Sequence, residues 1–312
     1  MSPAAVREAR GTPPDSAIRR RDGRMEHVQS ESEQSGAGTA GRVPISAQEL
    51  GAGNERVVFL HGLMGRGKNF TTAARGLGED YRCLLVDLPN HGESAWTDRF
   101  DYAEQADLVA DFLASGFAAQ GPVNLVGHSM GGKTAMTLAL RHPELVERLV
   151  VVDIAPARRP RPAKGSSSDF THLLGSLAAL DLGAIETRAE ADRWLQEAIP
   201  SRTVRGFLLQ NLRRVDGGFR WQPNLAMLLA NLDAIGDFPR TEAHFDGPVL
   251  WIAGERSDYI GEDDLPEMKR LFPRTTRVAV KDSGHWVHSE QPGTFLDILR
   301  YFLRQPAGGA GR

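Results

Sequence analysis

Gly127-His128-Ser129-Met130-Gly131 is the most informative stretch of this 312-residue sequence. It follows an apolar run at 123–126, typical of a buried strand, and opens a helical stretch at 131–142. A G-x-S-x-G pattern in this context predicts a sharp strand-to-helix turn that exposes the serine hydroxyl, with glycines where side chains would clash. The helix would aim its N-terminal N–H groups at a developing negative charge. Ser129 is therefore the candidate nucleophile.

Short apolar runs alternate with helical stretches along much of the chain, and such runs suit strands covered on both faces. Strands are predicted at 56–60, 83–87, 123–126, 148–153, 249–253 and 276–280, and helices at 102–114, 131–142 and 292–304. This alternation predicts an α/β fold with a mostly parallel central sheet and helices on both faces.

Residues 157–246 break the alternation, because they contain no convincing strand. Amphipathic helices are predicted there at 169–180, 188–199, 202–213 and 223–236. We expect an all-helical cap over the carboxyl ends of the strands, where ligands bind in open α/β sheets. The core would then comprise residues 46–156 and 247–305.

The composition, with 41% hydrophobic and 25% charged residues, is ordinary for a globular enzyme. A net charge of −3 gives no reason to expect nucleic acid or an anionic membrane as a partner. Cys83 is the only cysteine, which excludes an internal disulfide and a cysteine-built zinc site and favours a cytoplasmic location. No apolar run approaches the roughly 20 residues of a membrane span. Residues 1–45 and 306–312 are predicted to be disordered tails, and we expect a monomer or small homo-oligomer.

His61-Gly62-Leu63-Met64 follows the first predicted strand. Where a nucleophile turn of this kind occurs, the loop after that strand supplies one backbone N–H to the oxyanion and the residue after the nucleophile supplies the other. We therefore expect an oxyanion hole formed by the N–H groups of Leu63 and Met130, with Met64 as the alternative to Leu63.

The same loop also matches a phosphate-binding pattern. Gly62-Leu-Met-Gly-Arg-Gly-Lys68 fits G-x-x-x-x-G-K after a strand. However, Asn69 stands where a P-loop has Ser or Thr to bind Mg²⁺, and no later strand offers a clear companion aspartate. The hydrolytic interpretation explains four separate segments and the nucleotide interpretation only one, so we favour hydrolysis.

The general base is expected late in the chain, because the order in sites of this kind is serine, acid, histidine. His285, in Asp282-Ser283-Gly284-His285-Trp286, lies on the loop after the last predicted strand and is the candidate. His288 is the competitor, but it lies toward the following helix and lacks a preceding glycine turn.

Two aspartates compete for the role of the acid. Asp258 follows the strand at 249–253, but Ser257 holds the position usual for the acid, so that Asp258 comes one residue late. Asp153 ends the strand after the nucleophile helix, from where a carboxylate can also reach His285; its other possible role is to cap a loop. We favour Asp153 and keep Asp258 as the alternative.

Five spaced motifs carry a family resemblance. They are Leu60-His-Gly-Leu-Met-Gly-Arg-Gly-Lys-Asn69, Asp87-Leu-Pro-Asn-His-Gly-Glu-Ser94, Gly127-His-Ser-Met-Gly-Gly-Lys133, Val152-Asp-Ile-Ala-Pro156 and Gly284-His-Trp-Val-His288. Together they resemble the YbfF-type esterases and the related eukaryotic abhydrolase-domain-11 proteins over residues 45–305. The departures are the first 45 residues, which have no counterpart in the bacterial enzymes, and Pro89, where the motif has arginine.

This resemblance implies the α/β-hydrolase fold and the hydrolysis of acyl esters, with acyl-CoA thioesters as a further candidate class. It also implies a catalytic aspartate at Asp153 and an assisting serine at Ser257. The eukaryotic relatives are often assigned the later aspartate position, so Asp258 stays open.

We expect two-step acyl transfer on small to medium acyl chains, in which His285 deprotonates Ser129 and Asp153 orients His285. No metal or organic cofactor is expected. In the cap, candidates to line an acyl pocket, or merely to pack the cap itself, are Phe207, Leu208, Trp221 and Leu225. The rival hypotheses are perhydrolase or haloperoxidase chemistry, hydrolysis of a carbon–carbon bond, and a non-catalytic ligand-binding protein on the same scaffold.

Overall fold

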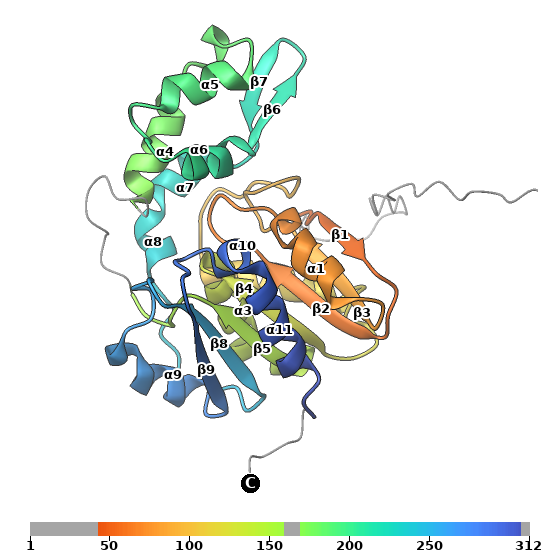
Figure 1. Ribbon diagram of the computed structural model, residues 1–312. Coiled ribbons are helices and arrows are strands. Elements are labelled where there is room, and N and C mark those ends of the chain that lie inside the picture. The colour runs from red at the N-terminus through yellow and green to blue at the C-terminus, as the bar shows by residue number, and fades with distance from the viewer. Residues whose placement is uncertain (1–42, 159–168, 307–312) are drawn as a thin grey trace, which may run out of the picture.

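A computed structural model describes residues 43–158 and 169–306 (Figure 1). Most of the two predicted tails lies outside these residues. The central feature is a seven-stranded sheet in the order β1-β3-β2-β4-β5-β8-β9. Its strands are β1 (Ala47–Leu50), β2 (Glu55–Leu60), β3 (Tyr81–Val86), β4 (Val123–His128), β5 (Val146–Val152), β8 (Val249–Gly254) and β9 (Thr275–Val280). All neighbours pair in parallel except β1 and β3, so the predicted mostly parallel sheet is confirmed.

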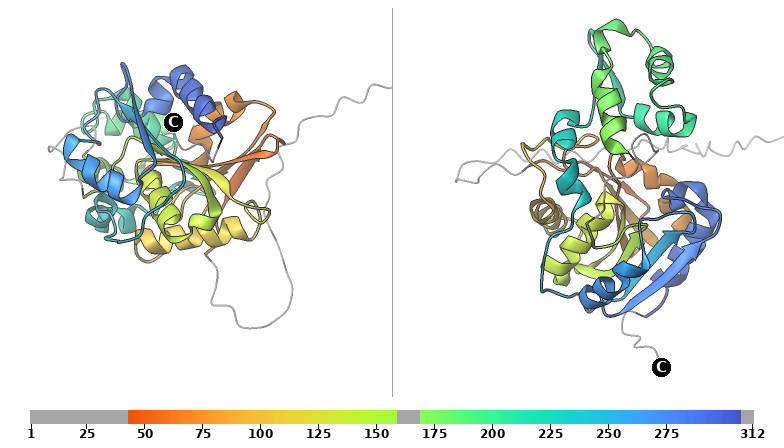
Figure 2. Two further views of the ribbon diagram at one scale, coloured as in Figure 1. Left: turned by 90° about the horizontal axis from the view of Figure 1, so that it is seen from below. Right: turned by 90° about the vertical axis from the view of Figure 1, so that its left-hand side faces the viewer.

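Helices cover both faces of the sheet, as predicted (Figures 1 and 2). The helices of this part of the chain are α1 (Thr71–Leu77), α2 (Tyr102–Ala114), α3 (Met130–Arg141), α9 (Leu265–Leu271), α10 (Val287–Glu290) and α11 (Pro292–Leu303). One apolar cluster packs α1 and α11 against alternate residues of the central strands, and a second cluster packs α2 and α3 against the others. The alternation follows from the period-two geometry of a strand, in which successive side chains point to opposite faces.

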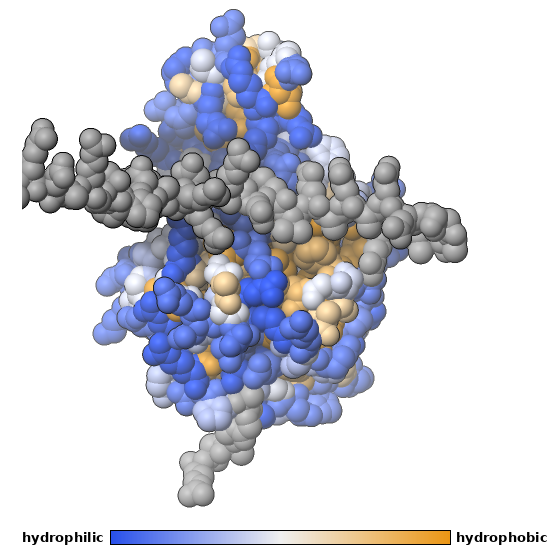
Figure 3. All heavy atoms as spheres, turned by 90° about the vertical axis from the view of Figure 1, so that its right-hand side faces the viewer, coloured by the Kyte–Doolittle hydropathy of each residue, from blue (hydrophilic) through white to orange (hydrophobic). Residues whose placement is uncertain are grey.

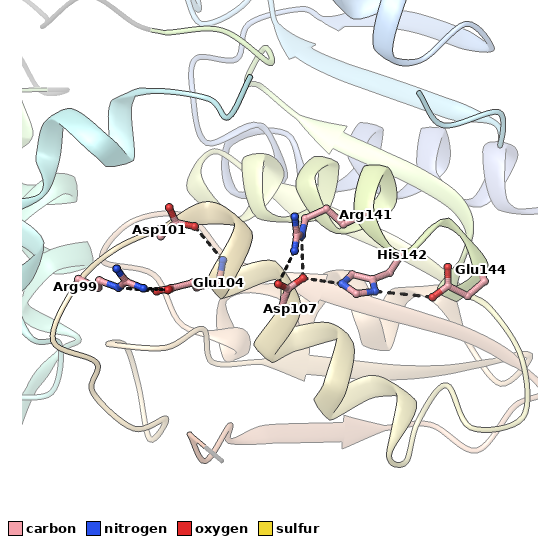
Figure 4. Close-up of polar contacts among 7 residues, drawn as sticks. All are labelled: Arg99, Asp101, Glu104, Asp107, Arg141, His142 and Glu144. Carbon is pink, nitrogen blue, oxygen red and sulfur yellow. Dashed lines mark hydrogen bonds and ion pairs between the residues drawn. The ribbon is translucent and has the colours of Figure 1, made fainter. Parts of the chain in front are cut away.

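The helix that follows Ser129 is held firmly against its neighbour. α3 is buried along almost its whole length, and at its exposed end both Arg141 and His142 hydrogen-bond the carboxylate of Asp107 on α2 (Figure 4). Asp101 caps the first turn of α2 by accepting a hydrogen bond from the Glu104 N–H. The exposed ion pairs add little stability individually, so buried packing is what fixes α3.

Residues 169–236, which we call the insertion, form a separate lobe beside the sheet (Figure 1). Its elements are α4 (Phe170–Ala179), α5 (Arg188–Leu195), α6 (Arg202–Leu209), β6 (Leu212–Val215), β7 (Gly218–Trp221), α7 (Leu225–Ala230) and α8 (Leu232–Gly236). Its leucines continue the apolar cluster of the α2 and α3 face. The surface of the insertion, at the top of Figure 3, is mostly hydrophilic with scattered apolar residues.

The prediction of an all-helical cap is wrong. Residues 212–221 form an antiparallel hairpin, β6–β7, in which Leu212 pairs with Trp221. The predicted helix at 202–213 therefore ends at Leu209, and the one predicted at 223–236 is divided into α7 and α8. The turn at Asp216-Gly217-Gly218 places both glycines at positive φ, 86° and 151°, a conformation that favours glycine and reverses the chain.

Candidate active site

Ser129 lies in the sharp turn between β4 and α3. Its φ of 54° and ψ of −120° are strained for a residue with a side chain. The turn is held at both ends, because the Ser129 N–H donates to the Val152 carbonyl at 3.1 Å and the Lys133 N–H donates to the Ser129 carbonyl at 3.0 Å. The predicted strand–turn–helix context of Ser129 is therefore present.

The two glycines of the turn are sterically required. A Cβ on Gly127 would lie 2.3 Å from the Gly131 carbonyl oxygen, and a Cβ on Gly131 would lie 2.4 Å from the carbonyl oxygens of both Leu60 and His61. These neighbours are backbone atoms, so a larger residue would force the strand and the helix apart. The tight turn thus needs glycine on either side of Ser129.

His285 and Asp153 come together from the loops after β9 and β5, two strands that flank β8 in the sheet. Nδ1 of His285 lies 2.8 Å from Oδ2 of Asp153. The Asp153 side chain is fully buried, and that of His285 is 11% exposed. Asp153 has a φ of 51° directly after β5, which turns its carboxylate toward the loop that carries His285.

The carboxylate of Asp153 has two further hydrogen-bond donors. The Gly254 N–H donates to Oδ1 at 2.9 Å, and the Ser257 hydroxyl donates to Oδ2. Asp258, the other candidate acid, is exposed on the same loop as Ser257. Of the two aspartates, the structure therefore brings Asp153 to Nδ1 of His285, with Ser257 beside it.

The loop after β2 is fixed by two buried histidines. The Met64 N–H donates to Nε2 of His91 at 3.2 Å, and the Leu88 N–H donates to Nε2 of His61 at 3.0 Å. Nδ1 of His61 lies 2.8 Å from the Gly62 carbonyl, and Nδ1 of His91 lies 3.1 Å from the Pro89 carbonyl. Each ring is therefore a neutral tautomer that donates from Nδ1 and accepts at Nε2.

Burial makes these histidines hard to protonate. Desolvation lowers the pKa of His61 from 6.5 to about 4 and the pKa of His91 from 6.5 to about 3. Both rings stay neutral near pH 7 and can keep accepting the two N–H groups. These roles could not be predicted from the sequence, because the partners of each ring are backbone groups that only the fold brings together.

Ser129 and His285 line one small cavity that is partly open to solvent. Leu63 and Asn69 line it from the loop after β2, and Phe170 and Phe207 line it from the insertion. The remaining lining residues are His61, Gly62, Gly65, Phe70, His128, Trp286, His288 and Ser289. The insertion therefore forms part of the wall above the carboxyl ends of the strands.

Only one of the four predicted cap residues lines this cavity. Phe207 does, with its ring centroid 5.7 Å from that of Trp286, whereas Leu208, Trp221 and Leu225 pack in the apolar cluster of the insertion. Phe170 was missed because residues 159–180 carry no pattern that separates a wall residue from a packing residue.

His288 lies three residues after His285, on α10. Its ring stacks on Phe70 with centroids 4.6 Å apart, and burial lowers its pKa from 6.5 to about 3. Of the two histidines, His285 is the one whose ring is hydrogen-bonded to Asp153.

The alternative phosphate-binding interpretation of residues 62–68 fails on the same loop. The Gly67 N–H, which would face a phosphate in a P-loop, donates to the Asp87 carboxylate at 2.7 Å. Residues Gly67–Phe70 form a short 3₁₀ helix rather than the start of a long helix. An anionic phosphate would meet a carboxylate there, which is unfavourable.

Comparison with known proteins agrees with this geometry. Residues 55–292 match the family model described as the alpha/beta hydrolase fold. The chain belongs to this family. The resemblance to YbfF-type and abhydrolase-domain-11 proteins is also confirmed, by the relatives that follow.

A mouse protein named sn-1-specific diacylglycerol lipase ABHD11 is 38% identical, over 79% of this chain and 80% of the relative. Esterase YbfF of Escherichia coli is 29% identical, over 80% of this chain and 93% of the relative. A solved structure described as a marine microorganism esterase superposes with a TM-score of 0.77 at 33% identity, over 83% of this chain and 99% of that one. Within residues 43–158 and 169–306, no helix is both long and apolar enough to cross a membrane.

Proposed function

We propose that this protein is a serine hydrolase that cleaves carboxylic esters through an acyl-enzyme intermediate, with Ser129 as the nucleophile. One observation carries the proposal: Ser129, on its positive-φ turn, shares a cavity with His285, whose Nδ1 is hydrogen-bonded to the buried Asp153. Membership of the alpha/beta hydrolase family, with relatives named as esterases or lipases, supports it.

His285 is the proposed general base. Because Nδ1 donates its proton to Asp153, Nε2 keeps the lone pair that can take the proton of the Ser129 hydroxyl. The same nitrogen then protonates the leaving alcohol and later activates the water that releases the acid. Tyr259 stacks on the imidazole with centroids 3.9 Å apart, which supports the orientation of the ring.

Asp153 is the proposed acid, with Ser257 assisting. The hydrogen bonds from Gly254 and Ser257 satisfy its oxygens and hold the carboxylate in one orientation toward His285. There it orients the imidazole and stabilises the cation that forms when His285 takes the proton.

The backbone N–H groups of Leu63 and Met130 are the proposed oxyanion hole. The Met64 N–H is already bonded to His91, which supports Leu63 as the donor from this loop. Met130 is the first residue of α3, so its N–H is among those that a helix leaves without an internal partner. Each such donor is typically worth about 3 kcal/mol of transition-state stabilisation.

Small to medium acyl chains are the proposed substrates. Phe170, Phe207 and Trp286 give the cavity an apolar, aromatic wall beside Ser129. Such a wall favours an acyl chain over a charged group, because burying apolar surface is favourable and burying an unpaired charge is costly. No metal ion or organic cofactor takes part in the proposed steps.

The test is a substrate panel with a serine variant. The parent and Ser129→Ala would be compared on p-nitrophenyl esters from acetyl to palmitoyl, on the matching acyl-CoAs and on an emulsified diacylglycerol. We expect turnover of acetyl to octanoyl esters by the parent and none by Ser129→Ala. Ser115→Ala, at the exposed end of α2, is the control and should match the parent. Ester turnover that survives in Ser129→Ala would overturn the proposal.

A further inference from the structure

Lys133 is a buried cation one helical turn after Ser129. Its side chain is 1% exposed, and Nζ donates to three backbone carbonyl oxygens: those of Ala157 at 3.0 Å, Gly236 at 2.8 Å and Asp237 at 2.8 Å. An ammonium group has three N–H donors in a compact tripod, which matches three carbonyls that converge on one point.

The three carbonyls belong to the two legs that join the insertion to the core. Ala157 lies on the leg that leaves β5, and Gly236 and Asp237 lie where α8 ends and the chain returns toward β8. A single side chain thus bonds both the exit and the return of the insertion. The C-terminal end of α8 presents carbonyl groups with partial negative charge, which favour a cation.

Tyr102 also attaches the return leg of the insertion to the core. Its hydroxyl donates to the Ile235 carbonyl at 2.8 Å, within α8, and its ring centroid lies 6.0 Å from Nζ of Lys133. The position of the return leg is therefore set by two buried side chains, one from α2 and one from α3. A cation near an aromatic ring in a buried place adds to this attachment.

Lys133 is also part of the nucleophile turn. The backbone N–H of Lys133 donates to the carbonyl of Ser129 at 3.0 Å, so both lie on the first turn of α3. The insertion carries Phe170 and Phe207, which line the cavity opposite that turn. Lys133 therefore contacts the nucleophile turn through its backbone and the two legs of the insertion through its side chain.

We propose that Lys133 is a positioning residue that sets where the insertion stands over Ser129 and so determines which acyl chains fit. The catalytic consequence rests on the proposed esterase function; the positioning itself does not. An acetyl group reaches few residues beyond the core, whereas a longer acyl chain must pack on Phe170 and Phe207. Loss of Lys133 should therefore penalise long chains selectively.

Lys133→Met removes the three donors and keeps an unbranched side chain of similar length. We expect kcat/KM for the octanoyl ester to fall at least tenfold more than kcat/KM for the acetyl ester, mainly through KM. Arg141→Met is the matched control, because it removes an exposed cation from the same helix that pairs with Asp107 and not with the insertion. It should leave both esters unchanged.

A distance measurement tests the positioning without any turnover. Trp194 on α5 and Tyr301 on α11 are 48% and 72% exposed, so both can be changed to cysteine for nitroxide labels. The native Cys83 is buried and its pKa is raised to about 12, so it should resist the labelling reagent. Double electron–electron resonance should give a narrow distribution of label-to-label distances in the parent background. With Lys133→Met, the distribution should be broader or shifted.

An unchanged distance distribution, or equal losses on acetyl and octanoyl esters, would overturn the proposal. If Lys133→Met does not fold, Lys133→Gln, which keeps two N–H donors, takes its place and should show a smaller change of the same kind. Failure of the esterase proposal looks different, because the parent itself would then neither hydrolyse esters nor react with a fluorophosphonate at Ser129.

Discussion

The side-chain amide of Asn211 in the insertion donates a hydrogen bond to the Met64 carbonyl at 2.7 Å. Asn211 is fully buried, and Met64 follows Leu63, the proposed oxyanion donor. The Met64 N–H in turn donates to His91. The insertion therefore contacts the proposed oxyanion loop directly.

This contact predicts that Asn211→Ala lowers kcat. Without the amide, the Met64–Gly65 peptide can rotate, and the loop that carries Leu63 loses one of the hydrogen bonds that hold it in place. We expect a loss of about 1–3 kcal/mol in the free energy of unfolding, as for a buried hydrogen bond, and a fall in kcat of about tenfold. Urea unfolding and steady-state kinetics measure the two effects. Gln196→Ala, on the exposed part of the insertion, should change neither.

The two candidate acids give opposite predictions. Asp153→Asn keeps the shape of the side chain but cannot hold the same tautomer of His285, and a change of this kind typically costs about 10⁴ in kcat. Asp258→Asn, on an exposed residue, should retain activity within twofold. For both variants, kcat would be measured on the same p-nitrophenyl ester. The assignment of Asp153 is wrong if Asp258→Asn is the variant that loses activity.

The buried histidines predict a loss of stability in acid. The pKa values of His61 and His91 are lowered to about 4 and about 3, so the native state binds fewer protons than the unfolded chain between these values and 6.5. The contribution of these two rings to the free energy of unfolding is complete above about pH 6.5. It falls as the pH drops toward 4, by up to about 1.4 kcal/mol per pH unit for each ring.

His91→Gln isolates one of these contributions, because the amide oxygen can still accept the Met64 N–H but does not titrate. The free energy of unfolding in urea would be measured at about pH 7.5 and about pH 5. We expect the parent to lose more stability between the two than His91→Gln. His244→Gln, at an exposed site, is the control and should follow the parent. Equal losses in the parent and His91→Gln would contradict this role of His91.

Sequence patterns predicted six strands of the sheet, including β9 at one edge, but missed β1 at the other edge and the hairpin β6–β7. The inner strands are continuous apolar runs because both faces are buried, and that signal is local. β1 pairs antiparallel at the edge and is half exposed, so Ala47-Gln-Glu-Leu50 carries no such run. The hairpin β6–β7 was missed because Leu212 and Val215 extend the apolar pattern of α6, while pairing across the Gly217 turn decides the structure.

Within the candidate site, Ser129, His285 and Asp153 could be proposed because each follows a strand whose carboxyl end faces the cavity. The choice between Leu63 and Met64 could not be made, because it depends on His91, which the fold brings in from another loop. Lys133 was quoted in a motif without a role. Its partners are backbone carbonyls of distant segments, which leave no trace in side-chain patterns.

The role of Ser129 as the nucleophile is tested most directly by a pre-steady-state reaction with p-nitrophenyl acetate, followed by intact-protein and peptide mass spectrometry. We expect a burst of p-nitrophenol close to one equivalent when deacylation is slow, and an added acetyl group on the peptide that contains Ser129. His285→Ala should remove the burst. Steady turnover with no acetyl adduct in the quenched burst phase, or an adduct on another residue, would contradict Ser129 as the nucleophile.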